Sequence, residues 1–154
     1  MITDSPAGNV HRYQGIIESY YHGCNTVDVE LMMSCFTDDV VHYFTHYQPV
    51  RGAGALAQFW AHIVPKHGNM FSVDHCIVQE PEAVIEWTLE LTATPETGRE
   101  LIRGAEWYVF RDDRISEIRA YYLNRHESYD RPDFELWGYP YRERGYHLKG
   151  NAKP

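Results

Sequence analysis

Two histidines in a β-branched and aromatic run have a spacing that suits acid–base chemistry on one face of a strand. His42 and His46 flank Phe44 at alternate positions between Val40 and Tyr47, and alternate side chains of a strand point to the same side. Imidazole changes its charge near neutral pH, which suits the transfer of a proton. We favour His46 as the base, because the end of the strand should lie nearer the mouth of a cavity. The alternative is that both are structural or partly exposed histidines.

The His-x-x-x-His spacing also occurs in metal sites, but a strand does not suit it. At ~3.3 Å per residue the two positions would lie about 13 Å apart, too far to bind one zinc ion. We therefore predict no metal site, unless this segment is helical. The sequence also lacks glycine-rich nucleotide-binding loops, the zinc-protease helix motif and the serine-hydrolase elbow. We expect a protein that uses no cofactor.

Two further residues are candidates for proton transfer if they face the interior. His75 alternates with Val73 and Ile77, which predicts that it lies on an apolar strand face directed to the core. The alternative is a buried neutral histidine bonded to a carbonyl. Tyr20 belongs to an apolar helical stripe, where a core role is typical, but a buried hydroxyl still needs a partner.

The elements that must position these residues change from helical to extended along the chain. A helical period covers residues 13–24 and resumes over 29–39, and a third helix follows Arg51-Gly52 until Pro65 ends it. Residues 40–47 read as a strand, and four more extended runs cover 71–78, 83–94, 100–110 and 115–123. This order is typical of an α+β domain, with helices on one face of a curved sheet and a pocket between the layers.

The composition fits one folded domain and argues against several kinds of partner. A chain of 154 residues with 44% hydrophobic and 14% aromatic residues can bury one core and is unlike a disordered sequence. The net charge of −8 opposes attraction to nucleic acid or an anionic membrane surface. The three cysteines form no C-x-x-C pair, and the sequence shows no secretory signal or membrane span. We expect a cytoplasmic protein that binds neither nucleic acid nor membranes.

Several short motifs together are similar to those of one family. They are Tyr20–Asp28 (YYHGCNTVD), Phe36–Val41 (FTDDVV), Arg51-Gly52 before a helix, Gly104–Phe110 (GAEWYVF) and Ile115–Tyr122 (ISEIRAYY). Over residues 10–123 this pattern resembles the SnoaL-like branch of the nuclear transport factor 2 superfamily. The resemblance implies a cone-like curved antiparallel or mixed sheet packed on three N-terminal helices, the cystatin-like α+β barrel. It also implies a homodimer that forms through the outer face of the sheet.

The resemblance also implies roles for single residues. Compared with ketosteroid isomerases in this superfamily, Tyr20 stands at the catalytic tyrosine and Glu106 at the acid of the oxyanion hole. Phe44 stands where the isomerases have a carboxylate base, and phenylalanine cannot take a proton, so a histidine must replace it. His75 lies on the strand that carries the catalytic histidine in scytalone dehydratase and bile-acid 7α-dehydratase.

Glu106 alternates with Ile102 and Gly104 on a strand face that the resemblance places toward the cavity. Burial disfavours the charged form of a carboxyl group, so a neutral Glu106 would be able to donate a proton. The alternative is an exposed strand glutamate paired with Arg103 or Arg119.

These observations predict a cofactor-independent acid–base enzyme, an isomerase, dehydratase or cyclase, acting on a small, largely apolar cyclic or polyketide-like molecule. The base would be His75 or His46, while Tyr20 and Glu106 hydrogen-bond the developing oxyanion. We expect His42, Phe44, Trp60, Tyr122 and Trp137 to contact the substrate. The alternative is a non-catalytic module for small-molecule binding or oligomerisation.

The last 31 residues form a separate aromatic-rich segment. Residues 1–123 would make the SnoaL-like domain, and residues 124–154 hold six aromatic side chains and nearly balanced charges, unlike a solvating tail. We expect an extended C-terminal arm that packs across its own cavity mouth or onto a partner subunit, with Trp137 and Tyr141 excluding water as a lid. The alternative is an unordered terminus.

Overall fold

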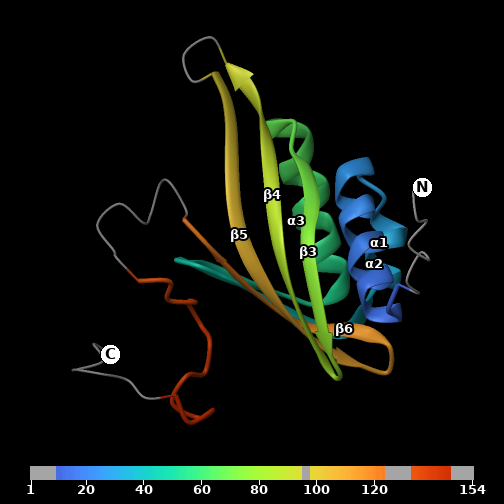
Figure 1. Ribbon diagram of the computed structural model, residues 1–154, viewed down its shortest axis with the longest axis vertical. Coiled ribbons are helices and arrows are strands. Elements are labelled where there is room, and N and C mark those ends of the chain that lie inside the picture. The colour runs from blue at the N-terminus through green and yellow to red at the C-terminus, as the bar shows by residue number, and fades with distance from the viewer. Residues whose placement is uncertain (1–9, 95–97, 124–132, 147–154) are drawn as a thin grey trace, which may run out of the picture.

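Three helices pack on one face of a six-stranded sheet that is curved and does not close on itself (Figure 1). The computed structural model describes residues 10–94, 98–123 and 133–146. The helices are α1 (Arg12–Thr26), α2 (Val29–Ser34) and α3 (Ala53–His67). The strands are β1 (Phe36–Phe44), β2 (Tyr47–Arg51), β3 (Met70–Gln79), β4 (Glu82–Thr94), β5 (Gly98–Arg111) and β6 (Arg114–Tyr122). The predicted α+β class is confirmed.

The sheet has the strand order β2-β1-β6-β5-β4-β3. The pair β1–β6 is parallel, and all other neighbours are antiparallel. The sheet is therefore mixed, as expected. Strands β2 and β3 form the two edges of the sheet. The three helices cover one face of the curved sheet as a single layer (Figure 1).

Helix α1 contributes a long buried stripe to this layer. It buries Tyr13, Ile17, Tyr20, Tyr21 and Cys24 on one side, which is the predicted stripe. The helix ends where the next residue, at 27, takes a left-handed conformation (φ 58°). The stripe directs two neighbouring tyrosines into the space between helix and sheet.

Three predicted boundaries differ in the structure. The second helix ends at Ser34 rather than residue 39, because Phe36 already begins β1. The third helix continues through Pro65 to His67 and ends at Gly68, which is left-handed (φ 59°). Pro65 lies in the last turn and is exposed, so its ring disturbs little of the helix. The predicted strand 40–47 is divided into β1 and β2 by a turn.

Helix α1 also protects the free edge of β3. The Asn25 side chain donates a hydrogen bond to the Phe71 carbonyl (2.8 Å) and accepts one from the Phe71 amide (2.7 Å). Asn25 therefore pairs with the edge as a neighbouring strand would. Such pairing satisfies backbone groups that an edge strand otherwise leaves open.

The described part of the C-terminal segment, residues 133–146, lies on the face of the sheet opposite the helices, which we call the outer face (Figure 1). Leu136 forms a bridge with Thr45 and is buried with Tyr43 and Tyr139. Residues 133–146 therefore pack on the sheet of their own domain. Residues 124–132 and 147–154 of the predicted arm lie outside the described residues.

Candidate active site

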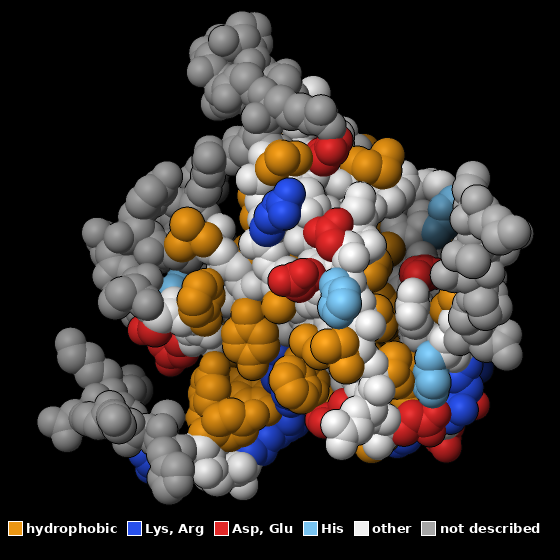
Figure 2. Space-filling model, viewed as in Figure 1, with side chains coloured by type: hydrophobic (Ala, Val, Ile, Leu, Met, Phe, Trp, Pro, Cys, Tyr) orange, Lys and Arg blue, Asp and Glu red, His pale blue; other side chains and the backbone are white. Residues whose placement is uncertain are grey.

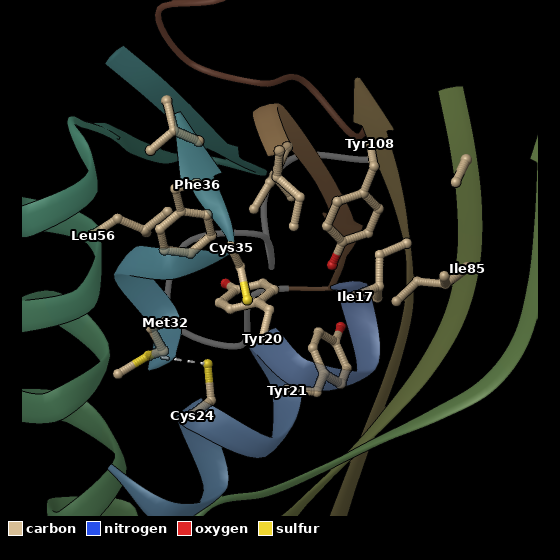
Figure 3. Close-up of a cluster of buried hydrophobic side chains, with 14 of the residues drawn as sticks. Ile17, Tyr20, Tyr21, Cys24, Met32, Cys35, Phe36, Leu56, Ile85 and Tyr108 are labelled. Carbon is tan, nitrogen blue, oxygen red and sulfur yellow. Dashed lines mark hydrogen bonds between the residues drawn. The ribbon is translucent and has the colours of Figure 1, made fainter. Parts of the chain in front are cut away.

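Glu106 is the acidic group of the interior. Along β5, Glu106, Tyr108 and Phe110 point inward and are buried, with Glu106 only 6% exposed. Its Oε2 accepts hydrogen bonds from the Tyr21 hydroxyl (2.9 Å) and from the Tyr108 hydroxyl. Figure 3 shows these two hydroxyls directed toward one another between α1 and the sheet. The predicted inward direction of Glu106 is confirmed, and Arg119 instead pairs with Glu117.

His42 is the basic group nearest to this carboxylate. It projects inward from β1, is fully buried, and holds its Nε2 3.7 Å from Oε1 of Glu106. Its ring stacks on Phe44 with centroids 3.9 Å apart, and Trp60 lies edge-on at 5.9 Å. Within the described part of the chain, neither ring nitrogen has a hydrogen-bond partner. A buried imidazole without partners is costly unless it serves a ligand or a proton.

Three tyrosines surround the Glu106 carboxylate. Burial raises the pKa of Tyr20, Tyr21 and Tyr108 well above the usual value for tyrosine, and the nearby Glu106 charge adds to the effect. All three therefore stay protonated at neutral pH and can act only as neutral hydroxyls. Tyr21 and Tyr108 use theirs to hold Glu106, while Tyr20 packs edge-on against Phe36 (5.0 Å) in the core.

Two indole groups add hydrogen-bond donors to the interior. Trp60 on α3 and Trp87 on β4 each bury an Nε1–H that has no acceptor among the described residues. The rings of Trp60 and Phe71 have centroids 5.4 Å apart, and those of Trp87 and Tyr122 have centroids 5.8 Å apart. Trp60 and Tyr122 are half-buried and pack against the core. The interior thus contains the His42–Glu106 pair and two indole N–H groups that have no acceptor among the described residues.

The prediction that His75 faces the core is wrong. The pairing of β3 with β4 shifts by one residue between Val73 and His75. Val73 is half-buried before this bulge, and Cys76 is half-buried after it, so the alternation reverses and His75 is exposed. A bulge inserts one residue and exchanges the two faces of the strand beyond it. His75 therefore lies away from Glu106.

The prediction that His46 shares the face of His42 is also wrong. Strand β1 ends at Phe44, and His46 occupies the following turn with a left-handed backbone (φ 51°). Its side chain is buried, and its Nε2 lies 2.8 Å from Oδ1 of Asp133. Its backbone amide donates to the Glu135 carbonyl (3.0 Å). His46 therefore anchors the C-terminal arm.

Trp137 and Tyr141, the residues expected to form a lid, lie near His46 in the arm. Trp137 is half-buried with its ring 6.3 Å from His46, and the Tyr141 hydroxyl accepts from the Leu136 amide (2.8 Å). Both residues lie with the arm on the outer face. The structure does not bring them to the His42–Glu106 pair.

Sequence reasoning missed Tyr21 and Tyr108 and ranked His42 below His46. One signal was present for each tyrosine. Tyr108 stands two residues from Glu106 on the same strand face, and Tyr21 belongs to the same buried stripe as Tyr20. Helical spacing alone does not tell which of two adjacent tyrosines reaches a given group on the sheet.

Among the residues that the structure describes, no group of three histidine, cysteine, aspartate or glutamate side chains is placed to hold a metal ion. No helix in the described ranges is long and apolar enough to cross a membrane.

The comparison with protein families agrees with this fold. The family model described as a SnoaL-like domain matches residues 17–118. The chain belongs to this family. Among curated proteins, no sequence matches this SnoaL-like protein significantly.

Solved structures include several with the same fold. A protein of unknown function with a cystatin-like fold from Methylobium petroleophilum is 32% identical, with a TM-score of 0.77 over 93% of this chain and 95% of that chain. An LEH-like epoxide hydrolase from M. tuberculosis is 17% identical, with a TM-score of 0.64 over 73% and 83%. A candidate polyketide cyclase from Xanthomonas campestris pv. campestris is 18% identical, with a TM-score of 0.60 over 73% and 90%.

Proposed function

We propose that this SnoaL-like protein is an acid–base enzyme for a small, largely apolar cyclic or polyketide-like substrate, with His42 as the base. One observation carries the proposal. His42 is fully buried, its Nε2 lies 3.7 Å from the Glu106 carboxylate, and neither of its nitrogens has a hydrogen-bond partner among the described residues. A base needs such an available nitrogen together with a group that stabilises its charged form.

Each residue around His42 would have a different role in a proton transfer. His42 would take a proton from the carbon next to a substrate carbonyl, and the C–H electron pair would move into an enolate. Glu106, held by Tyr21 and Tyr108, would stabilise the imidazolium through its negative charge. The unpartnered N–H of Trp60 would be a donor to the enolate oxygen, so that the stabilising dipole is in place before reaction.

The fate of the proton then defines the reaction type. In an isomerisation the imidazolium returns the proton to a different carbon. In a dehydration it protonates the departing hydroxide, and in a cyclisation the enolate carbon attacks a second carbonyl whose oxygen takes the proton. The epoxide hydrolase and the candidate polyketide cyclase of this fold support catalysis in such an interior. All three reactions require the same first step.

That first step can be measured without the natural substrate. The protein is incubated in D₂O with a panel of cyclic ketones of one to three rings, including 1-tetralone, and mass spectrometry follows the uptake of deuterium. We expect His42→Gln to lower the exchange rate at least about 100-fold. His75→Gln is the matched control, since His75 is exposed on the other side of the sheet, and it should leave the rate unchanged.

Two results would contradict the proposal. One is an exchange rate that His42→Gln does not change. The other is binding of a panel ketone with no exchange above the buffer rate, which would support the alternative of a non-catalytic binding module. Glu106→Gln adds a second readout, because it removes the negative charge that would stabilise the imidazolium 3.7 Å away, and it should lower the exchange rate.

A further inference from the structure

A cavity lies on the outer face of the sheet, and Ala105, Glu106 and Trp107 of β5 are among the residues that line it. It has a volume of about 790 Å³, within the range of small-molecule sites. Its floor includes Val84 and Trp107, and the arm supplies Tyr139, Arg144 and Tyr146. Figure 2 shows hydrophobic side chains gathered on this face beside the arm, with basic side chains among them. We call this cavity the arm groove.

The arm groove has a cationic end. Arg119 and Arg144 both bind Glu117: Nη1 of each donates to Oε1 (2.9 and 2.8 Å), and Nη2 of Arg144 donates to Oε2 (2.7 Å). Two guanidinium groups thus share one carboxylate, which leaves one positive charge in excess. Arg119 is only 7% exposed, and its Nε has no hydrogen-bond partner within the described ranges. A partly desolvated guanidinium is a strong, planar site for a carboxylate.

The middle of the arm groove is lined by aromatic rings that pack against the Arg119 guanidinium. The Arg119 guanidinium lies over the rings of Trp107 (5.4 Å) and Tyr139 (5.6 Å). Trp107 is nevertheless 38% exposed, and Tyr146 is 47% exposed. Their accessible rings offer flat surfaces to a planar ligand, while the cation between Trp107 and Tyr139 restrains both rings.

The opposite end of the arm groove is acidic. Glu82 lines the cavity and is half-buried without an ion pair among the described residues. In the sheet, Glu82 faces Val109 and Trp107 faces Arg119 on neighbouring strands. Two strand spacings and a two-residue offset place the Glu82 and Arg119 backbones roughly 12 Å apart. A ligand that reaches from one end to the other must therefore be an anion at the first and a hydrogen-bond donor at the second.

We propose that the arm groove binds a planar aromatic carboxylate that carries a hydroxyl or amino donor at its far end. The carboxylate binds at Arg119 and Arg144, the ring lies on Trp107 and Tyr146, and the donor faces Glu82. Glu106 also lines this cavity, but the groups that would bind the ligand do not include His42, Tyr21 or Tyr108.

The test is calorimetric titration of the full chain with 4-hydroxycinnamate. We expect saturable binding that Trp107→Ala weakens by about tenfold or more, as expected for loss of a stacking partner. Leu101→Ala is the matched control, because Leu101 is 50% exposed on the same face of β5 outside the cavity, and it should leave the affinity unchanged. The methyl ester of the probe, which has no anion, should bind at least about tenfold more weakly.

A second comparison tests the orientation. The intact protein should prefer 4-hydroxycinnamate to cinnamate, and Glu82→Ala should abolish this preference, whereas Glu86→Ala on the exposed part of β4 should keep it. Equal binding of acid and methyl ester would overturn the proposal, and so would equal loss in Trp107→Ala and Leu101→Ala. If no acid binds and Trp107→Ala halves the mass in light scattering, the groove is a subunit interface and the proposal is wrong.

Discussion

The three tyrosines around Glu106 predict a steep loss of stability in alkali. The pKa values of Tyr20, Tyr21 and Tyr108 are raised in the folded chain because burial opposes the phenolate charge. The unfolded chain releases these protons near pH 10. Their contribution to stability is therefore fully present below pH 10 and is lost as the pH rises above it.

The magnitude follows from the number of protons that the unfolded chain releases. Each buried tyrosine lowers the free energy of unfolding by about 1.4 kcal/mol per pH unit above pH 10. The three together remove about 4 kcal/mol per unit, a large part of a typical domain stability of about 5–15 kcal/mol. At this slope the domain should unfold between roughly pH 11 and 14.

Urea unfolding at a series of pH values from 8 to 11.5 measures this slope. Tyr108→Phe removes one of the three phenols, so the slope above pH 10 should fall by about 1.4 kcal/mol per unit, whatever the variant loses at neutral pH. Tyr47→Phe is the control, because Tyr47 is 41% exposed and should leave the slope unchanged. The reasoning is refuted if absorbance shows all 12 tyrosines ionising near pH 10 while circular dichroism stays native.

Three further predictions concern the edges of the fold. Leu136→Ala should lower the free energy of unfolding by about 2–3 kcal/mol, because Leu136 is 1% exposed, whereas Phe134→Ala, at 56% exposure, should change it little in the same urea titration. Asn25→Ala should cost about 1–3 kcal/mol and speed hydrogen exchange of the Phe71 amide, which loses its acceptor; unchanged exchange would contradict the edge-pairing role. Truncation after Leu123 should uncover apolar surface on the outer face and increase dye fluorescence, and a variant with the dye binding of the full chain would disprove this.

The inward direction of many candidate-site residues could be predicted from the local period of the helix or strand that carries them. The α1 stripe follows a helical period, and Glu106, Tyr108 and Phe110 follow a strand period, so their inward directions can be read from neighbouring residues. The same holds for His42 and Phe44 within β1. These directions depend on residues two to four positions away, and the sequence contains that information.

The sequence by itself therefore determined the α+β order, the family motifs and the inward strand face of Glu106. Only the tertiary structure decided which groups meet. One inserted residue in β3 turned His75 outward. A left-handed backbone at His46 placed its side chain against Asp133 of the arm. The choice of Tyr21 over Tyr20 as the partner of Glu106 joins residues 85 positions apart. Such contacts depend on how helices and sheet pack as rigid bodies, and a shift of one residue in a strand reverses every side chain beyond it.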